Sequence, residues 1–125
     1  MVCSATEKDE IREVMARYCH ALDAGQFDLV ARLFTADGEW TTDYDSAVGP
    51  AEIEKMLTRN VPRKGDGPQR KHYIANILIS LDGETADARS DYLIIRESAN
   101  GLIPVMGGTY LDTFAKVDGV WKFKR

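Results

Sequence analysis

His72 is the residue whose type and position point most directly to chemistry. It stands in QRKHYIANILISLDG (69–83), which reads as a strand closed by an Asp82-Gly83 turn. Because side chains alternate between the two faces of a strand, His72 is predicted to share an apolar face with Ile74, Asn76, Leu78 and Ser80. A histidine on such a face is either a core residue hydrogen-bonded to a neighbour or a general base in a pocket.

The opposite face of the same strand is apolar and available for burial. Alternation assigns to it Tyr73, Ala75, Ile77, Ile79 and Leu81. With Leu93 and Ile95 of the next strand, this outer sheet face looks too apolar for water. We therefore expect a homo-oligomer, a homodimer or homotrimer, that forms through this face.

A carboxylate that could serve His72 as a partner closes the first predicted helix. This helix is expected from about residue 7 to about 23, with Thr6 as its N-cap and Gly25 just beyond its end. Asp23, in the last turn, faces the negative end of the helix dipole, which costs a few tenths to about 1 kcal/mol. Asp23 is either a solvated helix-end residue or the acceptor for one imidazole nitrogen, which would fix the other nitrogen as a base.

Four further residues are candidates for a pocket around this pair. Tyr18 lies on the apolar stripe of the first helix, and its hydroxyl either donates to a substrate oxygen or pairs within the core. Trp40 and Tyr44, on a short predicted strand at 39–44, are candidates for the pocket wall. Asn76 either orients a ligand or satisfies a buried backbone group.

The order of the elements predicts an α+β domain that spans residues 1–125. A second helix, a short strand and a third helix opened by Gly49-Pro50 follow the first helix, and an irregular stretch covers 60–69. Alternation then predicts four antiparallel strands, with a bulge or bend at Gly107-Gly108, over residues 70–81, 85–97, 102–117 and 120–125. Such a sheet, bent around the N-terminal helices, can enclose a pocket on its concave face.

Composition narrows the range of partners. The 125-residue chain carries a net charge of −4 and has a pI of about 5.1, which argues against nucleic acid as a partner. A leader segment and a long apolar run are both missing from the sequence, so neither secretion nor a membrane span is expected. The two cysteines, Cys3 and Cys19, are predicted to be free cytoplasmic thiols, and no spacing indicates a metal site.

Four stretches together resemble the SnoaL-like family. They are RYCHALDAGQFDLVARLFTADGEW (17–40), GPAEIEKML (49–57), KHYIANILI (71–79) and VDGVWKFKR (117–125). The resemblance covers nearly the whole chain and implies the α+β cone of the nuclear transport factor 2-like superfamily, a curved mixed or antiparallel sheet wrapped around N-terminal helices. This fold hosts many activities, including cyclases, dehydratases, isomerases and non-catalytic subunits.

The resemblance also implies roles for particular residues. Scytalone dehydratase, bile acid 7α-dehydratase and hexachlorocyclohexane dehydrochlorinase use an Asp–His pair for elimination, and the motifs place that pair at Asp23 and His72. The bile acid enzyme has a catalytic tyrosine that matches Tyr18, and a substrate-orienting tyrosine of scytalone dehydratase lies in the region of Tyr44. Where scytalone dehydratase has a second histidine, this chain offers Asp91 and Tyr92, and Tyr92 is a candidate for substrate binding.

Two functions remain as hypotheses from the sequence. The first is a cofactor-independent lyase or isomerase, of dehydratase or cyclase type, that acts on a small, largely apolar cyclic molecule with His72 as general base and Asp23 as its partner. The second is a non-catalytic binding or assembly subunit, in which His72 is a satisfied core residue. An open pocket of a few hundred Å³ with His72 at its base would favour the enzyme.

Overall fold

The computed structural model describes residues 4–61 and 69–125. The helices are α1 (Ser4–Asp23), α2 (Phe27–Arg32) and α3 (Pro50–Asn60), and the strands are β1 (Glu39–Thr41), β2 (Ser46–Val48), β3 (Arg70–Asp82), β4 (Thr85–Ser98), β5 (Gly101–Val117) and β6 (Val120–Phe123). The predicted α+β order is confirmed. Most of the predicted irregular stretch, residues 62–68, lies outside the described residues.

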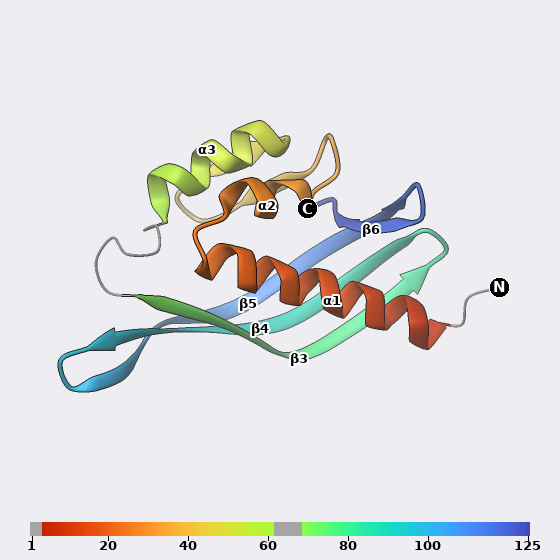
Figure 1. Cartoon of the computed structure of the whole chain (residues 1–125). Coiled ribbons are helices and arrows are strands. Elements are labelled where there is room, and N and C mark those ends of the chain that lie inside the picture. The colour runs from red at the N-terminus through yellow and green to blue at the C-terminus, as the bar shows by residue number, and fades with distance from the viewer. Residues whose placement is uncertain (1–3, 62–68) are drawn as a thin grey trace.

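The long strands form one antiparallel sheet in the order β3-β4-β5-β6, and β1 and β2 form a separate hairpin. Figure 1 shows α1 lying along one face of the bent sheet, with α2 and α3 grouped above it on the same side. The helices therefore cover a single face, as the predicted cone requires. This arrangement places the core, and any pocket, between the helices and the sheet.

Helix α1 is held to the sheet by one buried stripe: Ile11, Val14, Met15, Tyr18 and Leu22. The helix begins at Ser4, earlier than predicted, so Thr6 lies inside the first turn and its assignment as N-cap is wrong. No glycine or proline between Ser4 and Thr6 stops the helix from extending. At the other end Gly25 adopts a φ of 73°, which glycine reaches at little cost, and the chain leaves the helix there as predicted.

A β-bulge in β3 changes which side chains face the core. The register with β4 shifts between Ala75 and Leu78, and Asn76 lies in the bulge with a φ of 54°. One additional residue reverses the alternation, so the predicted faces hold for His72 and Ile74 but are wrong from Asn76 onward. Leu78 is 71% exposed on the outer surface, and the inner face of β3 carries three partly buried residues: Ile77, Ile79 and Leu81.

Irregularity in β5 lies elsewhere than predicted. The register shift between β4 and β5 falls between Ile94 and Ile95, opposite Pro104–Met106, whereas Gly107 and Gly108 pair regularly with Leu93 and Tyr92. Of the predicted bulge or bend at Gly107-Gly108, the bulge is therefore wrong. Gly108 instead leaves room for the Tyr92 ring. A Cβ atom at this position would lie 2.9 Å from that ring, which is too close.

The N-terminal end of α1 is fastened to the far end of the sheet by Glu7. Its carboxylate accepts a hydrogen bond from Lys116 Nζ at 2.8 Å and another from the Trp121 indole N–H. These hydrogen bonds hold the pKa of Glu7 below its ordinary value, with the Lys116 contact as the larger cause. With both ends of α1 fixed, the residues in its last turns are held at a defined position over the sheet.

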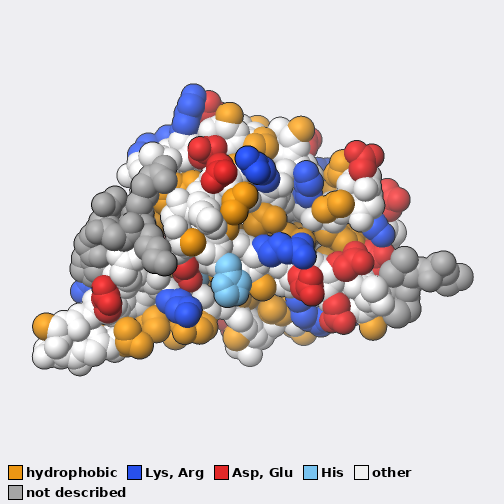
Figure 2. Space-filling view, viewed as in Figure 1, with side chains coloured by type: hydrophobic (Ala, Val, Ile, Leu, Met, Phe, Trp, Pro, Cys, Tyr) orange, Lys and Arg blue, Asp and Glu red, His pale blue; other side chains and the backbone are white. Residues whose placement is uncertain are grey.

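The surface shows mixed charge and a partly apolar outer face. On the side viewed in Figure 2, acidic and basic side chains are interspersed, so that face presents no extended basic surface. Tyr73 and Leu93 on the outer sheet face are 48% and 45% exposed, as predicted, but Ile77 and Ile79 belong to the inner face. Across residues 4–61 and 69–125, no helix is long and apolar enough to cross a membrane.

Candidate active site

Asp23 and His72 meet where the end of α1 crosses the start of β3. Asp23 Oδ1 lies 2.5 Å from His72 Nδ1, and both carboxylate oxygens accept the His72 backbone N–H at 3.1 Å. The His72 and Asp23 side chains are 10% and 18% exposed, so Asp23 is not a solvated helix-end residue. Because Nδ1 faces the carboxylate, Nε2 is the nitrogen available to a ligand.

The pair lines a cavity of about 690 Å³, which falls in the usual size range for small-molecule sites. Its walls come from α1, the β1–β2 hairpin and the inner faces of β3, β4 and β5. On the edge away from β4, β5 pairs with β6 only from Phe114 to Val117, so among the described strands the earlier part of this edge has no partner. Residues of this unpaired part line the cavity. The cavity therefore lies between this edge and the hairpin.

Aromatic side chains form the wall beside the pair. Tyr18, buried in α1, lies with its hydroxyl 3.4 Å from the Tyr110 hydroxyl, and Tyr92 stacks on Tyr110 with ring centroids 4.3 Å apart. Trp40 stacks on Phe34 at 6.0 Å. Burial raises the pKa of the Tyr18 and Tyr110 hydroxyls, so both stay protonated near neutral pH. Of the residues predicted from the sequence, Tyr18, Trp40 and Tyr92 line this cavity.

Tyr44 lies at the rim of the cavity. The strand predicted over 39–44 is shorter, because β1 ends at Thr41 and the chain turns into β2. Tyr44 is in that turn with 71% of its surface exposed, yet it is among the residues that line the cavity.

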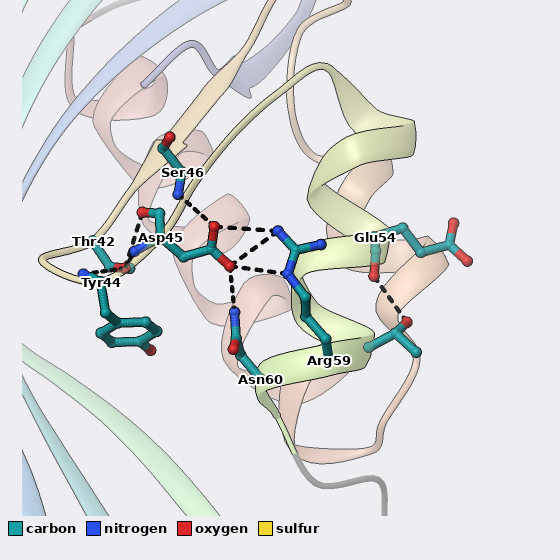
Figure 3. Close-up of polar contacts among 8 residues, drawn as sticks. Thr42, Tyr44, Asp45, Ser46, Glu54, Arg59 and Asn60 are labelled. Carbon is teal, nitrogen blue, oxygen red and sulfur yellow. Dashed lines mark hydrogen bonds and ion pairs between the residues drawn. The ribbon is translucent and has the colours of Figure 1, made fainter.

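The hairpin turn at this rim is tied to the end of α3 through Asp45, as Figure 3 shows. The Asp45 carboxylate accepts hydrogen bonds from Arg59 Nε at 3.1 Å and from Asn60 Nδ2 at 2.7 Å. Thr42 Oγ1 closes the turn by donating to the Asp45 carbonyl at 3.0 Å. The Arg59 and Asn60 contacts hold the pKa of Asp45 below its ordinary value, so this link is charged at neutral pH.

Asn76 does not belong to the cavity. The bulge turns it to the outer surface, where its amide donates to Asp91 Oδ2 at 2.9 Å. Thr109 donates to the other oxygen of Asp91 at 3.3 Å. The prediction that Asn76 orients a ligand is wrong, since strand alternation alone does not reveal a bulge.

Among the cavity residues that the sequence reasoning missed, two carry groups that could act on a ligand. Tyr110 and Asp112 both line the cavity from β5. Their signal was present in GGTYLDTF, where alternation puts a carboxylate between Tyr110 and Phe114 on one face of a strand. Burial raises the pKa of Asp112 to about 7.

Neither a metal site nor a reactive thiol is evident in the described part of the chain. Among these residues, no three His, Cys, Asp or Glu side chains gather closely enough to hold a metal ion. Cys19 is a free, partly buried cysteine on α1. Burial raises the pKa of its thiol to about 12, so it stays protonated at neutral pH and is a weak nucleophile. The other cysteine, Cys3, lies outside the described residues.

Comparison with known proteins agrees with this architecture. A protein described as nuclear transport factor 2-like, from Novosphingobium aromaticivorans, has a solved structure that superposes with a TM-score of 0.84 at 24% identity, over 97% of this chain and 79% of that one. A protein from the same organism, described as a candidate scytalone dehydratase, is 30% identical with a TM-score of 0.79, over 97% of this chain and 81% of that one. The fold is therefore the nuclear transport factor 2-like α+β cone.

The family model of the SnoaL-like domain matches residues 4–125, and the chain belongs to this family. A curated relative, the uncharacterized protein Rv2910c of Mycobacterium tuberculosis, is 28% identical over 92 residues. That match covers 70% of this chain and 59% of the relative, so it spans about three fifths of that protein's length.

Proposed function

We propose that this protein is a cofactor-independent enzyme that removes a proton from a small, largely apolar cyclic molecule. The observation that carries the proposal is the contact between Asp23 and His72 at the wall of an open cavity of about 690 Å³. A satisfied core histidine would not need to line an open cavity. The likeness to a candidate scytalone dehydratase supports a reaction of the dehydratase type.

In this proposal, His72 Nε2 accepts a proton from a ligand C–H bond, and Asp23 stabilises the imidazolium that forms. In a dehydration, the electron pair of that C–H bond forms the new double bond as a neighbouring hydroxyl leaves, and the imidazolium protonates it to water. In an isomerisation, the same proton returns to a different carbon. A placed general base contributes about 10²–10⁴-fold to the rate, so positioning and electrostatics in the cavity must supply the rest.

The protonated hydroxyls of Tyr18 and Tyr110 fit the role of oxygen ligands in this scheme. They are 3.4 Å apart, so one of them donates to the other and one hydroxyl proton remains for a ligand. Trp40 and Tyr92 would supply apolar contact to a ring, and Tyr44 would cover its outer end. Such a wall favours a flat cyclic molecule over a flexible chain.

Deuterium exchange tests this proposal without knowledge of the net reaction. Cyclic ketones, phenols and hydroxysteroids are incubated with the protein in D2O, and NMR follows the loss of C–H signals. We expect catalysed exchange for at least one compound and about a 10²–10⁴-fold slower rate in His72→Ala. The control is His20→Ala, because His20 is exposed on α1. Equal exchange in His72→Ala and the wild type would refute the proposed base.

The alternative, a non-catalytic binding or assembly subunit, has one observation in its favour. The outer sheet face exposes four large apolar side chains: Tyr73, Leu78, Leu93 and Leu111. We propose that copies of this chain associate through that face as a homodimer or homotrimer. Light scattering of Leu78→Lys/Leu111→Lys against the wild type tests this, since an unchanged mass would rule out that surface.

A further inference from the structure

Two arginines stand side by side on the inner face of the sheet, next to His72. Arg70 of β3 pairs in register with Arg96 of β4, and two residues further along the same strands His72 pairs with Ile94. Because alternate residues of a strand share a face, both arginines lie on the same face as His72 and the buried Ile94. Arg70 is exposed and lines the cavity with His72.

The two guanidinium groups have no counter-ion in the described ranges, 4–61 and 69–125. Neither arginine forms an ion pair there with a carboxylate. The Asp23 carboxylate is bound to His72. The Glu97 carboxylate, adjacent to Arg96 in the sequence, accepts the Gln69 backbone N–H at 3.1 Å. The Nε atom of Arg96 is also buried, and no described residue accepts a hydrogen bond from it.

Such a pair is unfavourable for the fold alone. Like charges directly opposite each other on neighbouring strands repel, and a buried donor without an acceptor loses hydration that nothing replaces. A bound anion would relieve both, because a guanidinium group binds a carboxylate through two parallel N–H···O hydrogen bonds. The arginine pair is therefore better explained by a ligand than by the packing of the sheet.

We propose that Arg70 and Arg96 bind a carboxylate of the ligand beside His72. The inference deepens the proposed function, on which it rests only in using the same cavity, by naming the substrate class: a largely apolar ring that carries one carboxylate. The arginines stand one inward-facing position away from His72, so the carboxylate would lie next to the reacting C–H bond and leave Nε2 free for it. Neutralised by the arginines, the carboxylate would not oppose removal of a proton from a neighbouring carbon.

The test compares 2-naphthoate with 2-naphthamide, its neutral analogue of nearly the same shape, by NMR titration of the protein at neutral pH. The wild type should bind naphthoate about tenfold more tightly, as expected for one charge-assisted contact. Arg70→Gln and Arg96→Gln should each lose most of this preference, while their affinity for naphthamide stays unchanged. High salt should weaken the binding of naphthoate only.

Lys71→Gln is the matched control for charge. Lys71 stands between Arg70 and His72, carries the same charge and is exposed on the outer face of the sheet, where it pairs with Ile95. Its replacement should change the affinity for naphthoate by no more than about twofold, because solvent screens a charge on that side. Amide NMR spectra report whether each variant is folded, and Arg70→Gln, at an exposed position, decides the matter if Arg96→Gln does not fold.

A further variant separates this inference from the proposed proton transfer. His72→Ala should bind naphthoate as the wild type does. If no ring compound exchanges deuterium but the preference for naphthoate and its loss in Arg70→Gln are both seen, the proton transfer is refuted and the carboxylate site stands. A wild type that binds both compounds equally or not at all would show that the arginines are merely solvated and would overturn the proposal. Equal losses of naphthoate affinity in Lys71→Gln and Arg70→Gln would overturn it as well.

Discussion

Asp23 holds His72 at two points, the ring and the backbone. One oxygen lies 2.5 Å from Nδ1, and both oxygens accept the backbone N–H at 3.1 Å. A carboxylate in the last turn of a helix is repelled by the negative end of the helix dipole. The contacts with His72 offset that cost. The same residue thus fixes the position of His72 in β3 and leaves Nε2 as the imidazole nitrogen available to a ligand.

The first prediction concerns Asp23→Asn. The amide oxygen can still accept the His72 backbone N–H, but the negative charge that stabilises an imidazolium is removed. We expect deuterium exchange in a reactive ligand to slow by about 10²–10⁴-fold with a melting temperature within a few degrees of the wild type. Asp28→Asn, on the exposed side of α2, is the matched control. Exchange at the wild-type rate in Asp23→Asn would show that the pair is structural.

The second prediction concerns stability and Asp112. Its pKa rises from 3.8 to about 7 on folding. Between about pH 4 and pH 7 the unfolded chain releases this proton while the folded protein keeps it, so the free energy of unfolding falls as pH rises. The full difference between the folded and unfolded pKa lowers the free energy of unfolding by on the order of 2–4 kcal/mol above pH 7. Asp112→Asn should therefore be more stable than the wild type at pH 8.5, with the gap closing near pH 4. Denaturant unfolding at both pH values measures this, and a gap independent of pH would contradict it.

The third prediction concerns Gly108. An alanine Cβ there would meet the Tyr92 ring at 2.9 Å, so the ring must leave its stacked position on Tyr110. We expect Gly108→Ala to destabilise the protein by about 1–3 kcal/mol and to weaken binding of ring compounds. Gly107→Ala is the control, because its nearest neighbour is the Tyr92 carbonyl oxygen at 3.4 Å. Equal melting temperatures for the two variants would contradict this packing.

The fourth prediction concerns the attachment of α1 by Glu7. The folded pKa of this carboxyl is depressed, so its stabilisation is present above about pH 4.5 and is lost as pH falls through the folded pKa. Glu7→Gln should melt at a lower temperature than the wild type at pH 7, and the difference should shrink in acid. Glu13→Gln, which removes an exposed pair with Arg17, should leave the melting temperature nearly unchanged. A difference that persists unchanged at pH 3 would argue against the ionic contact.

Periodicity and turn residues were sufficient to predict the elements and their order. The buried stripe of α1, the Gly49-Pro50 start of α3 and the three turns between the long strands are local signals. The contact of Asp23 with His72 joins residues 49 positions apart. Local patterns left two interpretations open for each residue, and the resemblance to the SnoaL-like family indicated that they pair. The catalytic role of that contact remains a prediction.

Features that depend on tertiary structure were not predictable in the same way. The bulge at Asn76 inserts one residue into a strand whose apolar run, IANILISL, has no glycine to mark it, so the assigned faces reversed after Ala75. Nor did the sequence show that residues 39–48 fold as a hairpin. Asp112 was missed because alternation puts it on the same face as Tyr110 and Phe114 but does not show that this face lines a cavity.

The most direct test of the central claim is the tautomer of His72, read from its ring nitrogens by 15N NMR. With Asp23 as its partner, the neutral ring should carry its proton on Nδ1 and leave Nε2 bare. Asp23→Asn and the binding of a ring ligand should each shift these signals, while those of His20 should stay in place. A His72 that is protonated on Nε2, or whose signals ignore both Asp23→Asn and every bound ligand, would contradict the claim that it is the base.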